Sequence, residues 1–227
     1  MTKNWTTTLL ICLSTFAFAD NSLKTAAEEI MHAGAFLNQA GLCPATSGNI
    51  SVRVSDDVIA LTVSGKHKGE LGPDDIMLVN LEGVPQNSSK KPSAETLLHT
   101  MIYNSCGDVG AILHTPSPNG TILTLLVEPD LYWSVQGYEI QKAFKGVTTH
   151  ESTLQIPIFE NSQDIRTLSQ EIASYLKKNP KTYGFLIRGH GLYTWGQDMK
   201  EAKIRSEAFE YLFECDLTLR ALKNLKK

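Results

Sequence analysis

His114 and His190 are the two histidines of this chain best suited to binding a metal ion. His114 ends an apolar run that begins at Val109, and His190 lies between two glycines in "RGHGLY". Each is therefore expected at a strand end, where its ring can reach a cavity. Catalytic zinc commonly takes three protein ligands and leaves one position for water or substrate. The residues alone provide two good ligands and no certain third.

The spacing around His114 raises a question. Alternate residues of a strand point to the same side, so a metal site here would use two histidines spaced by two. The chain instead has His114 and then Pro116, whose nitrogen offers no lone pair. From the residues alone, His114 is either part of a metal site that lacks one ligand or a histidine of the core.

Two loops rich in small polar groups are candidates for an anion site. They are "ATSGN" at 45–49 and "TVSGKHKG" at 62–69. Backbone N–H groups in such loops bind phosphate without a net positive charge, and Lys66 or Lys68 could add the charge. The alternative is two hydrogen-bonded turns beside a solvated basic loop. We take as candidate phosphate-binding residues Ser47, Gly48, Asn49, Ser64, Gly65 and Lys66.

Two glutamates are candidates for acid–base chemistry. Glu95 lies near the start of an expected helix, and Glu139 lies in "GYEIQKAF". A general base requires burial that raises its pKa toward neutrality. The alternative for both residues is an ordinary solvated carboxylate on a helix.

Composition is typical of one globular domain, which we place at residues 20–227. The chain has 227 residues, of which 42% are apolar and 20% charged, and its net charge of −3 gives no nucleic-acid footprint. Residues 1–19 resemble a signal peptide, with an apolar run before Ala17-Phe18-Ala19 that is too short for a comfortable membrane span. The four cysteines show no disulfide framework, which favours a reducing compartment.

The pattern of elements predicts a layered α/β fold with a mostly antiparallel sheet covered by helices. Strands come in antiparallel-looking runs with helices between them, without strict βαβ alternation. The clearest expected elements are helices at 23–40, 92–104 and 162–177, a helix that begins at Asp198, and strands at 50–54 and 109–114.

Several motifs in one order carry a family resemblance. They are "CPATSGNIS", "TVSGKHKG", "KPSAETLLH", "AILHT", "GYEIQKAF", "IPIFEN" and "RGHGLYTWG". The chain resembles the class II aldolase/adducin superfamily and, within it, the dehydratases of methylthioribulose 1-phosphate. The resemblance covers about 23–222. It implies three α/β/α layers around a mostly antiparallel central sheet, and a homotetramer with sites near subunit boundaries. It also implies one Zn²⁺ per subunit, held by an H-T-H pair and a later H-G.

The resemblance assigns roles to the candidate residues. His114 matches the first histidine of the pair, His190 matches the late ligand, and Pro116 occupies the position of the missing third histidine. This predicts weakened zinc binding and leaves an impaired enzyme open. Glu95 or His150 could replace the lost ligand. Glu139 is favoured as the base, and Glu95 is either a base or a ligand. Tyr193 and Trp195 could shape the methylthio pocket or belong to the core.

The implied reaction is a zinc-dependent dehydration of a sugar phosphate in methionine salvage. Two alternatives remain: an aldolase or epimerase on another phosphorylated sugar, and a non-catalytic adducin-like binding protein. We expect no nucleic-acid or membrane partner. The phosphorylated substrate favours the cytoplasm, although the segment at 1–19 leaves an exported form open.

Overall fold

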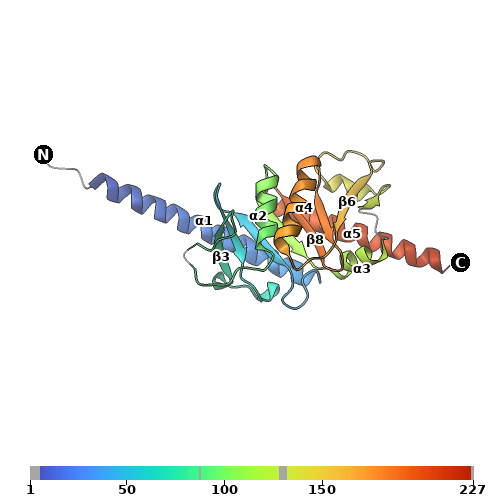
Figure 1. Ribbon diagram of the computed structural model, residues 1–227, viewed down its shortest axis with the longest axis horizontal. Coiled ribbons are helices and arrows are strands. Elements are labelled where there is room, and N and C mark those ends of the chain that lie inside the picture. The colour runs from blue at the N-terminus through green and yellow to red at the C-terminus, as the bar shows by residue number, and fades with distance from the viewer. Residues whose placement is uncertain (1–5, 87, 128–131, 226–227) are drawn as a thin grey trace.

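The protein folds into a layered α/β/α body from which the N-terminal end of one long helix projects (Figure 1). The computed structural model describes residues 6–86, 88–127 and 132–225, with side chains from residue 23 onward. The signal-like segment at 1–19 therefore lies outside the residues whose side chains are described. Within the described part of the chain, no helix is both long enough and apolar enough to cross a membrane.

One sheet of eight strands forms the middle layer, in the order β3-β2-β1-β4-β8-β7-β6-β5. Neighbouring strands are antiparallel except for the parallel pair β6 and β7. This confirms the predicted mostly antiparallel sheet. The strands are β1 (Asn49–Arg53), β2 (Val58–Thr62), β3 (Ile76–Asn80), β4 (Ala111–Thr115), β5 (Tyr132–Val135), β6 (Leu154–Phe159), β7 (Gly184–Ile187) and β8 (Gly191–Gly196).

Helices cover both faces of this sheet, which confirms the three-layer prediction. On one face lie α2 (Thr96–Ser105) and α4 (Ile165–Lys178); on the other lie α1 (Thr6–Gln39), α3 (Pro118–Leu126) and α5 (Met199–Asn224). Successive residues of a strand point to opposite faces. In β2, Ile59 and Leu61 pack toward α2 and α4, whereas Ala60 packs toward α1.

A close contact between α1 and the short 3-10 helix η1 (Lys68–Glu70) explains the glycine in the apolar stripe of α1. A Cβ atom at Gly34 would lie 2.3 Å from the carbonyl oxygen of Lys68. Only a residue without a side chain allows this approach, which seats the loop of Lys68 against the buried face of α1.

The sequence-based boundaries differ from the structure in three places. α1 begins at Thr6 rather than at residue 23, and α2 begins at Thr96 rather than at Pro92. The sequence pattern also did not predict α3. The N-cap residue of this helix, Ser117, accepts a hydrogen bond from the Gly120 N–H at 3.0 Å. The Ser117-Pro118 pair is a helix-start signal, because proline suits the first helical position.

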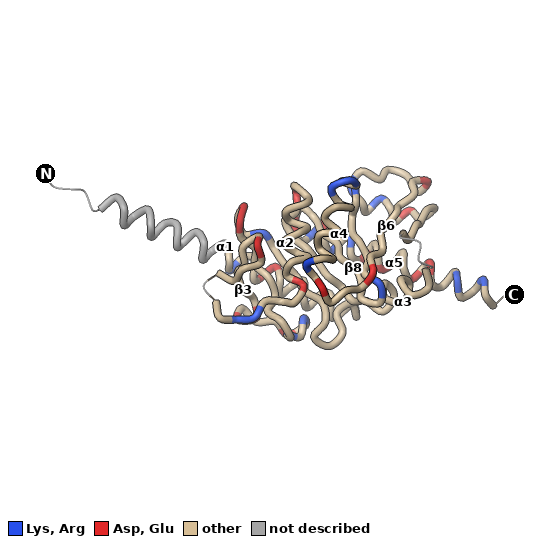
Figure 2. The backbone as a smooth tube through the Cα atoms, viewed as in Figure 1, with Lys and Arg blue, Asp and Glu red and all other residues tan. Residues whose placement is uncertain are grey.

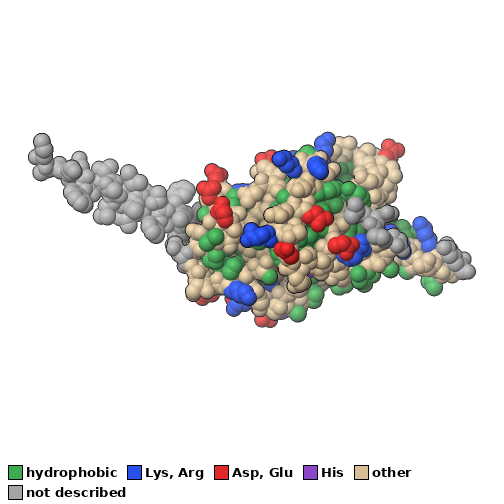
Figure 3. All heavy atoms as spheres, viewed as in Figure 1, with side chains coloured by type: hydrophobic (Ala, Val, Ile, Leu, Met, Phe, Trp, Pro, Cys, Tyr) green, Lys and Arg blue, Asp and Glu red, His purple; other side chains and the backbone are tan. Residues whose placement is uncertain are grey.

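Basic and acidic positions are interspersed along the backbone (Figure 2), and charged side chains of both signs are scattered over the face seen in Figure 3. Neither view shows a large area of a single sign.

Candidate metal and phosphate site

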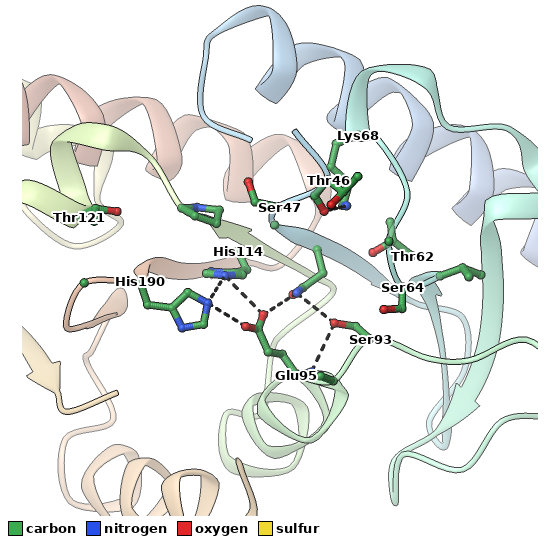
Figure 4. A pocket seen from close by; sticks show the side chains of 17 residues that line it. Thr46, Ser47, Thr62, Ser64, Lys68, Ser93, Glu95, His114, Thr121 and His190 are labelled. Carbon is green, nitrogen blue, oxygen red and sulfur yellow. Dashed lines mark hydrogen bonds and ion pairs between the residues drawn. The ribbon is translucent and has the colours of Figure 1, made fainter. Parts of the chain in front are cut away.

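A cavity of about 570 Å³ lies at one end of β1, β4 and β8 (Figure 4). It brings together four segments that are far apart in the sequence. They are the loop before β1, the loop after β2, the start of α2, and the turn between β7 and β8. His114, Pro116 and Thr121 complete the wall from β4 and the segment after it.

Strand register places the central side chains of this cavity. In the sheet, His114 of β4 is opposite Asn49 of β1 on one side and opposite Tyr193 of β8 on the other. The Tyr193 ring stacks on the His114 ring, with centroids 4.1 Å apart and planes at 8°. Three neighbouring strands thus fix the position of the His114 imidazole.

Glu95, His114 and His190 converge on one point of the cavity, as Figure 4 shows. The Nε2 atom of His190 lies 2.8 Å from Glu95 Oε1, and that of His114 lies 3.4 Å from Glu95 Oε2. The two Nε2 atoms are 3.2 Å apart. Ligand atoms bound to one Zn²⁺ at about 2.0–2.2 Å are separated by at most about 4.4 Å. The three side chains therefore fit a common metal ion.

The protonation of His114 suits a metal ligand. Its Nδ1–H donates to the carbonyl oxygen of Leu192 at 3.0 Å, so the lone pair of Nε2 faces Glu95 and His190. Burial lowers the pKa of His114 to about 4. The ring is therefore neutral at neutral pH, the form that binds metals.

Glu95 is held as a carboxylate. Its Oε2 atom accepts hydrogen bonds from Asn49 Nδ2 at 2.6 Å and from the Tyr193 hydroxyl at 2.7 Å. Burial alone would raise the pKa of Glu95. The hydrogen bonds from His190 and Asn49, and the positive charges that His114 and His190 carry when protonated, together lower the pKa of Glu95 below its ordinary value. An ionised carboxylate is a good metal ligand and a weak base at neutral pH.

Pro116 lines the same cavity without adding a donor atom. Its backbone packs closely on the turn that carries His190, since a Cβ atom at Gly191 would lie 2.6 Å from the Pro116 Cα. The position therefore adjoins the metal-binding cluster. Glu95 supplies the third donor of that cluster, where the sequence pattern left the ligand open.

Both polar loops line the cavity, on the side away from His190 (Figure 4). Five of the six candidate phosphate-binding residues take part: Ser47, Gly48, Asn49, Ser64 and Gly65. Gly48 and Gly65 have positive φ angles of 77° and 75°, a conformation that glycine adopts without strain.

Lys66 does not line this cavity, whereas Lys68 does. The Lys66 ammonium lies 2.8 Å from Asp75 Oδ1, in a salt bridge outside it. Lys68 is 2% exposed and donates to the carbonyl oxygens of Thr46 at 2.9 Å and Lys66 at 2.5 Å. Burial lowers the pKa of Lys68. The contact of η1 with Gly34, which no local sequence pattern reports, turns Lys68 inward.

Glu139 lies outside this cavity, on the 3-10 helix η3 (Glu139–Ala143). Its side chain is 70% exposed and lies beside Lys142 and, at 3.8 Å, His150 Nδ1. The hydrogen bond from Lys142 lowers the pKa of Glu139. Within its own chain, Glu139 is therefore not brought to the metal-binding cluster.

Tyr193 and Trp195 belong to the core between the sheet and helices α2 and α4. Tyr193 also contacts the cluster through its hydroxyl, but neither residue lines the cavity. The cavity wall contains further residues that the sequence pattern did not single out, namely Thr46, Thr62, Ser93 and Thr121. Ser93 could have been found from the helix-start motif "PSAE".

Comparison with known proteins decides the family. The sequence profile described as "Class II Aldolase and Adducin N-terminal domain" matches residues 28–217. The chain belongs to the class II aldolase/adducin family. It is 53% identical over 196 residues to the methylthioribulose-1-phosphate dehydratase of Pseudomonas syringae pv. syringae (strain B728a), covering 86% of this chain and 96% of that protein. The corresponding enzyme of Marinobacter nauticus is 50% identical over 193 residues, which cover 85% and 93% of the two chains.

Two solved structures have a similar fold. YgbL from Klebsiella pneumoniae superposes with a TM-score of 0.74 at 26% identity, covering 87% of this chain and 90% of its own. L-fuculose-1-phosphate aldolase from Thermus thermophilus gives a TM-score of 0.70 at 22% identity, covering 90% and 97% of the two chains. The second likeness supports the class II aldolase fold alone.

Proposed function

We propose that this chain is a metal-dependent dehydratase that converts 5-methylthioribulose 1-phosphate to 2,3-diketo-5-methylthiopentyl 1-phosphate in methionine salvage. The observation that carries the proposal is the 53% identity, over 86% of this chain, to an enzyme of that name. The cavity suits such a substrate, because imidazole and carboxylate groups lie on one side and two polar loops lie on the other.

We assign the metal as zinc, one ion per chain, held by Glu95, His114 and His190. His114 offers a neutral nitrogen donor, His190 offers a second ring nitrogen, and Glu95 offers a carboxylate that its neighbours keep ionised. When bound, the ion would supply Lewis acidity at the C2 carbonyl and its neighbouring hydroxyl, which makes the C3 proton easier to remove. Two histidines and a glutamate are an established zinc ligand set.

The phosphate group of the substrate would bind between the two polar loops. Backbone N–H groups around Gly48 and Gly65, with the hydroxyls of Ser47 and Ser64, offer donors there. Lys68 contributes a buried positive charge. Asn49 would orient Glu95 instead of binding the phosphate, because its amide already donates to Glu95 and, at 3.2 Å, to Ser93 Oγ.

The base that removes the C3 proton would be Glu139, supplied by a second copy of the chain. Glu95 is committed to the two histidines, and Glu139 lies outside the cavity of its own chain. A homotetramer with sites at subunit boundaries would bring the two together. Docking would also bury the exposed Glu139 carboxylate, and burial raises the pKa of a carboxyl group toward the range that a general base needs.

The direct experiment adds 5-methylthioribulose 1-phosphate to the zinc-loaded protein and follows the diketone product and the zinc content. We expect turnover that Glu95→Gln abolishes together with most of the zinc, and that Glu171→Gln, a matched change on α4, leaves intact. Cleavage of the substrate into two shorter carbonyl compounds would instead indicate an aldolase. Binding of the substrate without conversion would indicate an adducin-like binding protein.

A mixing experiment tests the shared site. Glu139→Gln and His190→Ala chains should each be inactive alone. After unfolding and refolding together, mixed oligomers should recover part of the activity, because some sites contain both an intact Glu139 and an intact His190. No recovery from mixed oligomers would mean that Glu139 acts within its own chain or not at all.

We place the reaction in the cytoplasm, since a phosphorylated substrate is retained there. Mass spectrometry of the N-terminus of the native protein tests this assignment. A protein that begins at Asp20 would contradict it.

A further inference from the structure

Behind the cavity, a ladder of buried polar side chains joins β1 to α2. Asn49 and Ser51 alternate along β1 and so point to the same side. Glu95, His99 and Tyr103 are spaced by four around α2 and so share one face of that helix. Hydrogen bonds link these five side chains in series. The series begins with Glu95 at the cavity, continues through Asn49, His99 and Ser51, and ends at Tyr103.

The ladder has a single consistent direction of hydrogen bonding. The ionised Glu95 can only accept, so Asn49 must present its Nδ2 to Glu95, at 2.6 Å, and its Oδ1 to His99. His99 must then donate from Nε2 to Asn49 and accept at Nδ1 from the Ser51 hydroxyl, at 2.7 Å. The hydroxyl of Ser51 in turn accepts from the Tyr103 hydroxyl at 3.0 Å.

His99 is the member that fixes this direction. It is completely buried, it does not line the cavity, and both of its ring nitrogens have partners. A neutral imidazole has one donor and one acceptor, which the two partners match. Burial lowers the pKa of His99 to about 3, in keeping with the neutral ring that the geometry requires.

We infer that His99 is a positioning residue, which acts through Asn49 to hold Glu95 in the orientation that binds the metal ion. The inference rests on the proposed function. Without the donor of His99, the Asn49 Oδ1 atom would lose its partner, and only the bonds of the amide to Glu95 and Ser93 would hold its orientation. Outer partners of metal ligands typically contribute a factor of about 10–100 in metal affinity or activity.

Three variants separate positioning from a general effect on stability. His99→Leu removes both hydrogen bonds at similar volume, whereas His99→Gln keeps a donor and an acceptor. Tyr103→Phe is the control, because it removes a hydrogen bond of the same ladder that lies beyond His99. Zinc affinity by chelator competition, kcat, KM and the melting temperature are measured for each folded variant.

We expect His99→Leu to lower zinc affinity and kcat by about 10–100-fold with little change in KM. His99→Gln should recover most of this loss, and Tyr103→Phe should lose stability without losing zinc affinity. Equal losses in His99→Leu and Tyr103→Phe, or unchanged zinc affinity in His99→Leu, would overturn the inference. If His99→Leu does not fold, two other measurements test the inference. They are the comparison of His99→Gln with Tyr103→Phe and the tautomer of His99.

The tautomer is measured in the unaltered chain by long-range proton–nitrogen NMR of the histidine rings. A neutral His99 protonated at Nε2 supports the inference, and protonation at Nδ1 contradicts it. Neither this spectrum nor the zinc affinity depends on turnover. Lack of dehydratase activity in the unaltered chain would therefore contradict the proposed function. The NMR spectrum and the zinc affinity would still test the role of His99.

Discussion

The Lys68 ammonium joins the two polar loops of the cavity, because it donates to the Thr46 carbonyl oxygen at 2.9 Å across 22 positions of sequence. The same nitrogen donates to the Lys66 carbonyl oxygen. One buried cation thus holds both loops in place and offers a positive charge to an anion between them.

This arrangement predicts different effects for the two lysines. Lys68→Met should weaken the binding of inorganic phosphate by at least about tenfold, because about 1.4 kcal/mol is a modest cost for one charge-assisted contact. Lys66→Met should change phosphate binding by less than about threefold, since exposed ion pairs contribute little. Isothermal titration of both variants with phosphate gives the answer. Equal losses would place Lys66 at the anion.

Pro116 offers a second prediction, because it adjoins the metal-binding cluster without a donor atom. Pro116→His should raise zinc affinity by at least about tenfold, or about 1.4 kcal/mol, by adding a ligand. Pro118→Ala is the matched control for removal of a proline from this segment. Chelator competition measures both. Unchanged affinity in Pro116→His would mean that Glu95 already completes the ligand set.

Gly34 is the contact point between α1 and η1, and its loss should disturb the cavity from outside. Gly34→Ala places a Cβ atom 2.3 Å from the Lys68 carbonyl oxygen, so the two backbones must separate. We expect a loss of about 1–3 kcal/mol in the free energy of unfolding, as for overpacked cores. Gly107→Ala has no heavy atom within 4 Å of the new Cβ and serves as the control in denaturant titrations.

Glu210 of α5 should make stability depend on pH. Burial raises its pKa to about 7, against the hydrogen bonds from Ser117 and Asn119, which lower it. The folded state therefore favours the protonated acid. The stability that this group contributes is complete below about pH 4.5, the ordinary value, and is lost as pH rises through about 7.

Glu210→Gln should remove this dependence. Relative to the unaltered chain, the variant should gain at least about 1 kcal/mol at pH 8 compared with pH 4, or roughly 2–4 °C in melting temperature. Glu207→Gln, an exposed residue of the same helix, is the control. Parallel melting curves for all three proteins across this pH range would contradict the expectation.

Local patterns in the sequence predicted the positions of single elements well, but not the pairing of distant ones. The apolar run that ends at Thr115-Pro116 placed His114 at the end of a strand, where β4 has it. Its neighbours Asn49 and Tyr193 come from strands 65 and 79 positions away, and their register depends on the packing of the whole sheet. The ladder behind Glu95 depends on the same long-range pairing.

The two lysines illustrate the same limit. Lys66 and Lys68 are both plausible partners of an anion in the linear sequence, since each follows a Ser-Gly turn. The contact between η1 and α1 turns Lys68 inward and leaves Lys66 with Asp75. A glycine 34 positions upstream decides between them, and no local pattern reports that contact.

The order of the strands implies that a bound metal ion would link the two halves of the sheet. Strands β1 to β4 form one contiguous half of the sheet and β5 to β8 the other, and among the described strands only the β4–β8 pairing joins the halves. His114 belongs to the first half, and His190 lies in the turn between β7 and β8 of the second half. Glu95 precedes α2, which lies between β3 and β4 in the chain. An ion bound by all three residues would therefore connect the two halves next to the β4–β8 pairing. Separation of the halves would require release of the ion. Hydrogen exchange at the amides of β4 and β8 should therefore slow as the metal ion binds.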